Sequence, residues 1–335
     1  MKKEIDQNQI DWVFIAKGIG ICLVVIGHFH PESSPEYWSN LRDIIYSFHM
    51  PLFFLLSGYL YNHGKYSYAD LVKAKTKRLL YPFISIAAIF LLIKYAAGIF
   101  VKLEHPVQIE SIYSLLTNPV NSYMPLLWFV YALFLIFTVY PLLKLYMDVY
   151  LLFALFIAIN SIIGNDYLVF GSALANIPFF IFGAILRENS ELSKRLVGAN
   201  CYYILVPLLL FITFHYLSNY FSIHQYLVYA TKVLIGVLGS IFVINLSHAI
   251  LKLSTFKAKD VIAEIGCYSM TIYLLHTLFE STVRIGFLQV LKNVQVPFEL
   301  IAFMAVLCGV MFPFIIEKQL LRKFRATKKF ILGIS

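Results

Sequence analysis

Two residues in the first apolar segment of this chain could do chemistry: Lys17 and His28, within the stretch AKGIGICLVVIGHFH. Both are costly in hydrocarbon, so each needs a polar exit or a function. They are eleven residues apart, which places them on one helical face about 16 Å apart along the axis. Gly18, Gly20 and Gly27 lie around them and predict close approach of a neighbouring helix or a ligand.

The chemistry that suits this pair is proton transfer at one end and anion binding at the other. A neutral imidazole can accept a proton from a hydroxyl nucleophile, and an ammonium group can bind a phosphate. Each residue also has a structural interpretation, Lys17 as a snorkelling lysine and His28 as a polar residue at the membrane interface. Their combination on one face favours a functional role.

The composition determines which kind of protein must position these two residues. Hydrophobic residues make up 60% of the 335-residue chain and charged residues 13%, which is too apolar for a soluble domain with a wettable surface. The apolar runs are unbroken and helix-length, whereas a transmembrane β-barrel would show alternating polarity. We therefore predict an all-α fold, a polytopic transmembrane helical bundle that occupies residues 1–335 as a single domain.

About ten apolar runs follow one another along the chain, and we expect each to be a membrane helix. Two of them, the fifth and the sixth, are short for a bilayer and should be bent, tilted against their neighbours, or extended by a few residues into the adjacent loops. The runs are Val13–His30, Ile44–Tyr61, Leu79–Phe100, Leu126–Tyr146, Val149–Ile163, Ala173–Leu186, Cys201–Leu217, Tyr226–Leu251, Cys267–Leu291 and Phe298–Ile316.

The basic residues test this count, because cytoplasmic loops retain Lys and Arg. With the amino terminus inside, only Arg42, Lys102 and Lys292 of the 27 basic residues fall in outside loops. Four lie within runs: Lys17, Lys94, Lys232 and Arg284. All others fall on the cytoplasmic side, so both termini are predicted to be cytoplasmic. This distribution also explains the net charge of +9 without a nucleic-acid partner.

Signals for processing, disulfides and metals are missing from the sequence. The first apolar run has no small-residue cleavage site, so we expect it to remain in the mature protein. The four cysteines form no CxxC pair, and His28 and His30 would point to different faces of a helix. With no HExxH motif or acidic cluster, no metal site is predicted.

Residues on other helices could support His28 or bind a ligand beside it. His49 enters the second run from outside, at a depth that can match His28, although it could equally be an interfacial histidine. Trp128 can be an interfacial anchor or a platform on which a ligand stacks.

The ninth run carries a polar stripe along one face, formed by four polar residues at three- and four-residue spacing. Glu280 and Arg284, one turn apart, are interpreted as a structural pair that faces the bundle interior. Tyr273 and His276 could line a substrate path. The stripe therefore consists of Tyr273, His276, Glu280 and Arg284.

Taken in order, several segments resemble the acyltransferase family 3 membrane proteins, and the fucose 4-O-acetylase-like branch in particular. The first helix matches the family's signature of a basic residue, ten residues and a histidine. Its basic position is commonly Arg in the family, whereas Lys17 stands there in this chain. The similar segments are IDWVFIAKGIGICLVVIGH, SFHMPLFFLLSGYL, PLLWFVYALF, NIPFFIFGAILR and IGCYSMTIYLLH.

This resemblance implies an O-acetyltransferase of the bacterial inner membrane. The expected reaction moves an acetyl group from cytosolic acetyl-CoA, a co-substrate and not a bound cofactor, to a sugar hydroxyl of an extracytoplasmic glycan or lipid-linked precursor. Lys17 would bind the CoA diphosphate, and His28 would act as general base or form an acyl-histidine intermediate.

Two other classes share some of these features. A transporter or flippase of lipid-linked sugar would have a similar span count, but related halves with discontinuous helices are expected there. A membrane-bound O-acyltransferase of the other major type would centre its chemistry on a late histidine, here His276.

Overall fold

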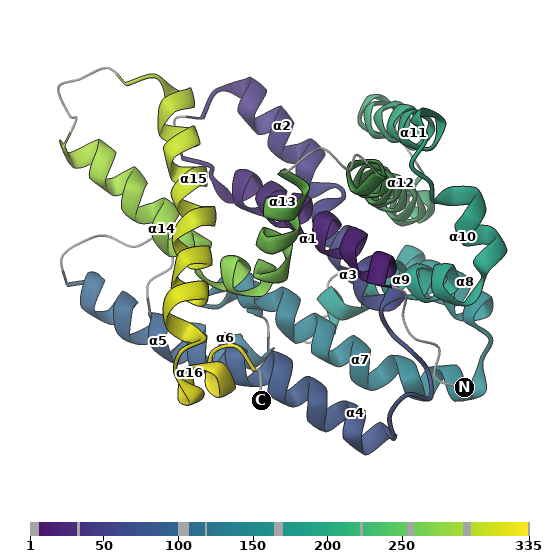
Figure 1. The fold of residues 1–335 in the computed structure, drawn as a ribbon, viewed down its shortest axis with the longest axis horizontal. Coiled ribbons are helices and arrows are strands. Elements are labelled where there is room, and N and C mark those ends of the chain that lie inside the picture. The colour runs from purple at the N-terminus through teal and green to yellow at the C-terminus, as the bar shows by residue number, and fades with distance from the viewer. Residues whose placement is uncertain are drawn as a thin grey trace.

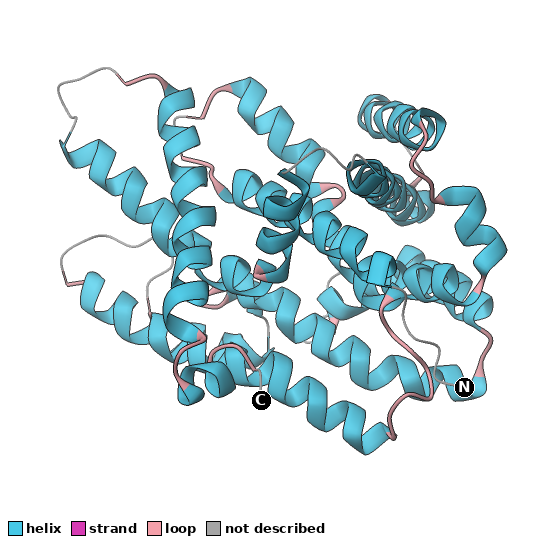
Figure 2. Ribbon diagram, in the orientation of Figure 1, coloured by secondary structure: helices cyan, strands magenta, loops and turns pink. Residues whose placement is uncertain are grey.

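The computed structural model describes residues 7–31, 34–99, 107–117, 119–163, 170–221, 224–252, 258–290 and 296–333. The regular structure in these ranges is helical (Figure 2), which confirms the all-α prediction. The helices are α1 Gln7–His28, α2 Glu36–Tyr46, α3 His49–Tyr59, α4 Tyr68–Lys75, α5 Tyr81–Ala97, α6 Ile109–Thr117, α7 Trp128–Tyr146, α8 Val149–Ile163, α9 Gly171–Glu188, α10 Ser190–Leu196, α11 Cys201–Tyr220, α12 Gln225–Lys252, α13 Ala258–Cys267, α14 Ser269–Val290, α15 Phe298–Ile316 and α16 Arg325–Phe330.

Fewer helices than predicted are long and apolar enough to cross a bilayer. Each of the ten runs is helical over most of its described length. In the described part of the chain, however, only six helical segments are both long enough and apolar enough to span a bilayer, or seven if α13 and α14 together form one span. The second, fifth and sixth runs form the shorter or less apolar helices α3, α8 and α9. The expected run ends at Phe100 and Leu291 lie outside the described residues.

The second run, Ile44–Tyr61, is two helices and not one. The chain turns at Ser47 and Phe48, between α2 and α3. Pro51 explains the break, because its ring would clash with the carbonyl of Ser47 in a continuous helix and it has no N–H to donate. The break puts His49 in the first turn of α3, where a proline is tolerated nearby.

The third and ninth runs also differ from their predicted bounds. The third span begins at Tyr68 and not at Leu79, because α4 continues through a π-helical turn, Thr76–Leu80, into α5. The ninth run begins at a bend of 84° between α13 and α14. The segment before that bend, taken as a cytoplasmic loop from sequence, is the helix α13.

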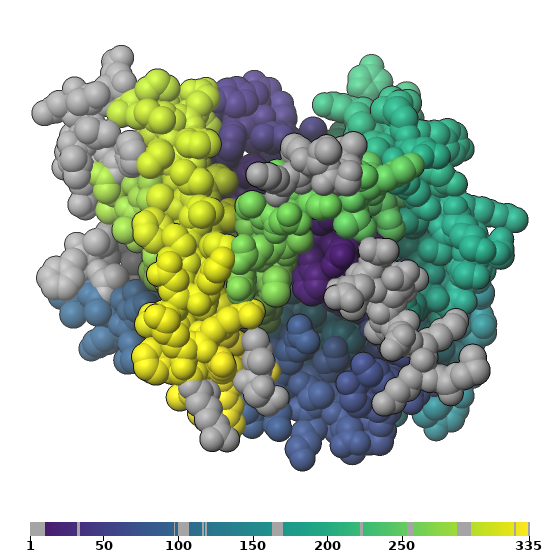
Figure 3. Space-filling model, viewed as in Figure 1, coloured from purple at the N-terminus to yellow at the C-terminus, as the bar shows by residue number. Residues whose placement is uncertain are grey.

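Helix α1 runs through the centre of the molecule (Figure 1) and packs against α3, α12, α13, α14 and α15. In the space-filling view only a small part of its dark purple surface is visible, beside a green segment (Figure 3). Glycines permit the closest of these contacts. A Cβ on Gly266 of α13 would overlap the carbonyl oxygen of Phe14, and one on Gly18 would overlap that of Ile262. The predicted close approach at Gly18 is therefore confirmed.

Candidate functional site

Three histidines from three different helices meet at the carboxyl-terminal end of α1. The ring centroid of His28 lies 5.2 Å from that of His276 in α14 and 6.5 Å from that of His49 in α3. Tyr46, the last residue of α2, closes the group with its hydroxyl 3.3 Å from Nδ1 of His28. We call His28, His49, His276 and Tyr46 the histidine cluster. It joins the first three helices of the chain to α14, which is remote from them in sequence.

A contact with a backbone carbonyl fixes the ring orientation of two of these histidines, His49 and His276. Nδ1 of His49 lies 2.8 Å from the carbonyl oxygen of Ile45, and Nδ1 of His276 lies 2.8 Å from that of Tyr273. A carbonyl only accepts, so both Nδ1 atoms carry the proton and both Nε2 atoms have a lone pair. Nε2 of His276 is buried with no hydrogen-bond partner among the described residues.

The acidic member of the ninth run lies one turn beyond His276. Glu280 is almost completely buried, and its Oε1 has no hydrogen-bond partner among the described residues. Arg284 lies within electrostatic range of it. A Cβ on Gly309 of α15 would come within 3.2 Å of Oε1, so α15 packs directly on this carboxyl group.

Tyr273 and Trp128 lie near each other but have different surroundings. Tyr273 is buried and donates its hydroxyl to the carbonyl of Leu126, just before α7 begins. This bond positions the start of α7, and Tyr273 does not line the adjacent cavity. Trp128 is the first residue of α7 and does line that cavity. The structure thus leaves Trp128 accessible to a ligand and gives Tyr273 a structural contact.

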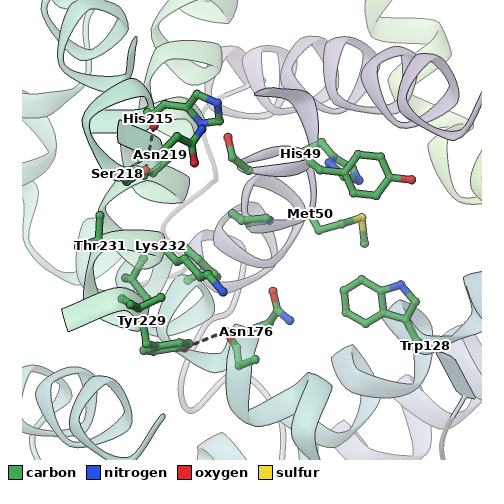
Figure 4. Close-up of a pocket in the computed structure, with 18 of the residues that line it drawn as sticks. His49, Met50, Trp128, Asn176, His215, Ser218, Asn219, Tyr229, Thr231 and Lys232 are labelled. Carbon is green, nitrogen blue, oxygen red and sulfur yellow. Dashed lines mark hydrogen bonds between the residues drawn. The ribbon is translucent and has the colours of Figure 1, made fainter. Parts of the chain in front are cut away.

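The histidine cluster opens into a cavity of about 680 Å³, within the range of small-molecule sites, about 300–1,000 Å³. Figure 4 shows its polar walls, with His49 and Trp128 on one side and Lys232 with Tyr229 on the other. The lining comes from α1, α2, α3, α7, α9, α11 and α12. His28 and Tyr46 belong to it, whereas His276 lies behind them.

A second polar group surrounds Lys17, in the amino-terminal half of α1. Lys75 of α4 and Arg78 of the π-helical turn both lie within electrostatic range of it. The ammonium group of Lys75 also lies 3.4 Å from the centre of the Phe137 ring. We call Lys17, Lys75 and Arg78 the cationic cluster. Three like charges this close repel one another, which makes an anionic ligand a favourable neighbour.

Lys17 and His28 are connected by one packed face of α1. Between them, at helical spacing, stand Ile21 and Val24, which are both completely buried. Lys17 does not line the cavity that His28 lines. The two sites therefore lie along one helix, separated by apolar side chains in this structure.

The sequence matches the model of the family described as an acyltransferase domain, acyltransferase family 3, over residues 10–316. The chain belongs to acyltransferase family 3. This membrane-bound acyltransferase is a multi-pass protein, and the matched region includes both clusters. No curated protein and no solved structure matches its sequence or fold.

Three residues of the two clusters, Lys75, Arg78 and Tyr46, are not singled out by the sequence pattern. The hydropathy pattern predicts a cytoplasmic loop at Lys75 and Arg78, because both precede the expected run at Leu79. Their three-residue spacing directly before an apolar run was the available signal, since it places both on one helical face. Tyr46 had no such signal, because its contact with His28 depends on the break at Pro51. Among the described residues, no group of histidine, cysteine or acidic side chains could hold a metal ion.

Proposed function

We propose that this protein transfers an acetyl group from cytosolic acetyl-CoA to a sugar hydroxyl of an extracytoplasmic glycan or lipid-linked precursor. One observation carries the proposal: His28 belongs to the histidine cluster, which opens on a ligand-sized cavity, and the other half of the same helix carries Lys17 of the cationic cluster. The family membership supports the reaction class.

The cationic cluster is the proposed site for the diphosphate of the donor. Lys17 supplies a point charge where the family commonly has Arg, and Arg78 supplies the planar fork that binds two phosphate oxygens at once. Bringing the thioester to His28 then requires the pantetheine arm to follow α1. Because Ile21 and Val24 fill that face, donor binding must move side chains between α1 and its neighbours.

His28 is the proposed general base. Its Nδ1 faces the Tyr46 hydroxyl, so a tautomer with the proton on Nδ1 donates to Tyr46 and leaves a lone pair on Nε2. Nε2 removes the proton of the acceptor hydroxyl as its oxygen attacks the thioester carbonyl. The C–S bond then breaks, and the CoA thiolate takes the proton from the imidazolium. We prefer this direct transfer to an acyl-histidine intermediate.

The proposed location is the bacterial inner membrane, with both termini in the cytoplasm. In this orientation the cationic cluster faces the cytosol and the histidine cluster lies toward the outer surface. That is the order that a cytosolic donor and an extracytoplasmic acceptor require.

The decisive experiment compares surface glycans from cells with and without this protein by mass spectrometry. We expect loss of 42 Da, the mass that one O-acetyl group adds, from a defined sugar when the protein is removed, and its return with the wild-type gene but not with an H28A gene. Unchanged glycans, together with lipid-linked glycan that no longer crosses the bilayer, would instead identify a transporter.

A further inference from the structure

Lys232 stands in an unusual position for a lysine of a membrane span. It is the eighth residue of α12, about 10 Å along the helix from its first residue. No described residue forms an ion pair or hydrogen bond with it. A charge at this depth is costly without a partner, and such residues usually face a polar cavity.

The cavity beside the histidine cluster is where this charge points. Figure 4 shows the ammonium group of Lys232 directed into the cavity, on the side of Asn176. Among the described lining residues there is no aspartate or glutamate that could neutralise it. Asn176, Asn219 and Thr231 add amide and hydroxyl groups to the same walls. The wall around Lys232 therefore combines a positive charge with hydrogen-bonding groups inside a largely apolar cavity, and a cation with hydrogen-bond donors is the chemistry that recognises phosphate.

Lys232 and His28 line this one cavity from two different helices, α12 and α1. A ligand that fills the cavity can therefore contact both at once. We propose that Lys232 binds the phosphate group of the acceptor, so that the acceptor is a sugar carried on a phosphate or diphosphate. This inference rests on the proposed function, because only a transferase has an acceptor. Binding of an anion at Lys232 does not itself depend on acyl transfer.

Snorkelling is the alternative explanation for Lys232. A snorkelling lysine extends its ammonium group toward the headgroup region and has no specific ligand. The two explanations differ in one measurable respect. An anion site in the cavity gives the protein a preference for a phosphorylated lipid that depends on Lys232, and snorkelling gives none.

Binding to the purified full-length protein in detergent tests the proposal directly, with no acyl donor present. The probes are farnesyl diphosphate, farnesol and inorganic diphosphate, and the readout is the dissociation constant from native mass spectrometry. We expect farnesyl diphosphate to bind wild type about 10-fold more tightly than farnesol, and K232Q to lose about that factor, as expected for one charge-assisted hydrogen bond. K232R should retain binding within about 3-fold, because it keeps the charge.

Lys252 provides the matched control, since it is an exposed lysine at the other end of the same helix and outside the cavity. K252Q should bind farnesyl diphosphate as wild type does. Equal binding by wild type and K232Q would place the diphosphate elsewhere, at the cationic cluster for example, and would overturn the proposal. If inorganic diphosphate binds as tightly and with the same dependence on Lys232, the anion site is supported and its ligand is a free phosphate compound.

The outcome also separates this inference from the proposed function. Binding that depends on Lys232 in a protein that transfers no acyl group would leave the anion site standing and refute the acetyltransferase. Acyl transfer with equal KM for phosphorylated and neutral glycosides, in both wild type and K232Q, would refute the anion site and leave the acetyltransferase proposal intact.

Discussion

The imidazole rings of His28 and His276 lie 5.2 Å apart, although one ends α1 and the other belongs to α14, near the opposite end of the chain. The carbonyl of Tyr273 holds the proton of His276 on Nδ1, so its Nε2 lone pair is directed away from that contact. His276 can therefore orient a partner or accept a proton, whereas Tyr46 contacts His28 itself.

Replacing His28 should abolish acyl transfer while the protein remains folded. General-base catalysis contributes about 10²–10⁴-fold to a rate, so H28A should fall by at least about 100-fold in CoA released from acetyl-CoA. His30, which is exposed two residues further on, provides the matched control, and H30A should retain the wild-type rate. Equal activity of H28A and H30A would refute the base assignment.

Substituting His276 tests which of the two histidines is central. If His276 only positions His28, H276A should keep measurable activity and combine less than additively with H28A, because the two residues then act as one unit. The measurement is kcat for wild type, both single variants and the double variant. An inactive H276A beside an active H28A would support the other type of membrane-bound O-acyltransferase.

Removing charge from the cationic cluster should weaken donor binding more than it slows chemistry. K17Q should raise KM for acetyl-CoA by about 10-fold, the factor expected for one hydrogen bond to a charged group, with a smaller change in kcat. K17R should stay near wild type. Lys73 is exposed on α4 close to Lys75, so K73Q removes a charge near the cluster but not from it, and its KM should not change.

The packing of α1 against α13 should be sensitive to a single methyl group. In G266A the new Cβ would overlap the carbonyl oxygen of Phe14, and overpacking of this kind costs about 1–3 kcal/mol. Thermal unfolding in detergent should therefore show a lower Tm. Gly286 of α14 has no atom within 4 Å of its added Cβ, so G286A should keep or slightly raise the Tm, since Ala favours a helix.

The orientation of the chain can be measured with reporters at its carboxyl terminus. Because basic residues accumulate in loops on one side, we expect a fused green fluorescent protein to fluoresce and a fused alkaline phosphatase to be inactive. The opposite pattern would place the carboxyl terminus outside, and with an even number of spans it would also move the donor site away from the cytosol.

The sequence by itself determined the class of this protein and singled out Lys17 and His28. Apolar runs of helix length require a helical membrane fold, because every backbone polar group in hydrocarbon must be paired within its own segment. The spacing of Lys17 and His28 placed both on one face, because helical periodicity depends only on local geometry. Close approach at Gly18 could also be predicted, because glycine has no Cβ to hold a neighbouring helix away.

Only the tertiary structure decided what surrounds those two residues. The contacts of His28 with Tyr46 and His276 depend on the break at Pro51 and the bend before Ser269. The hydropathy pattern predicts neither the break nor the bend. Lys75 joined Lys17 because α4 packs into the bundle instead of ending in a loop. Local patterns specify a helix and its faces, whereas the partner of each face is set by packing between segments that are remote in the chain.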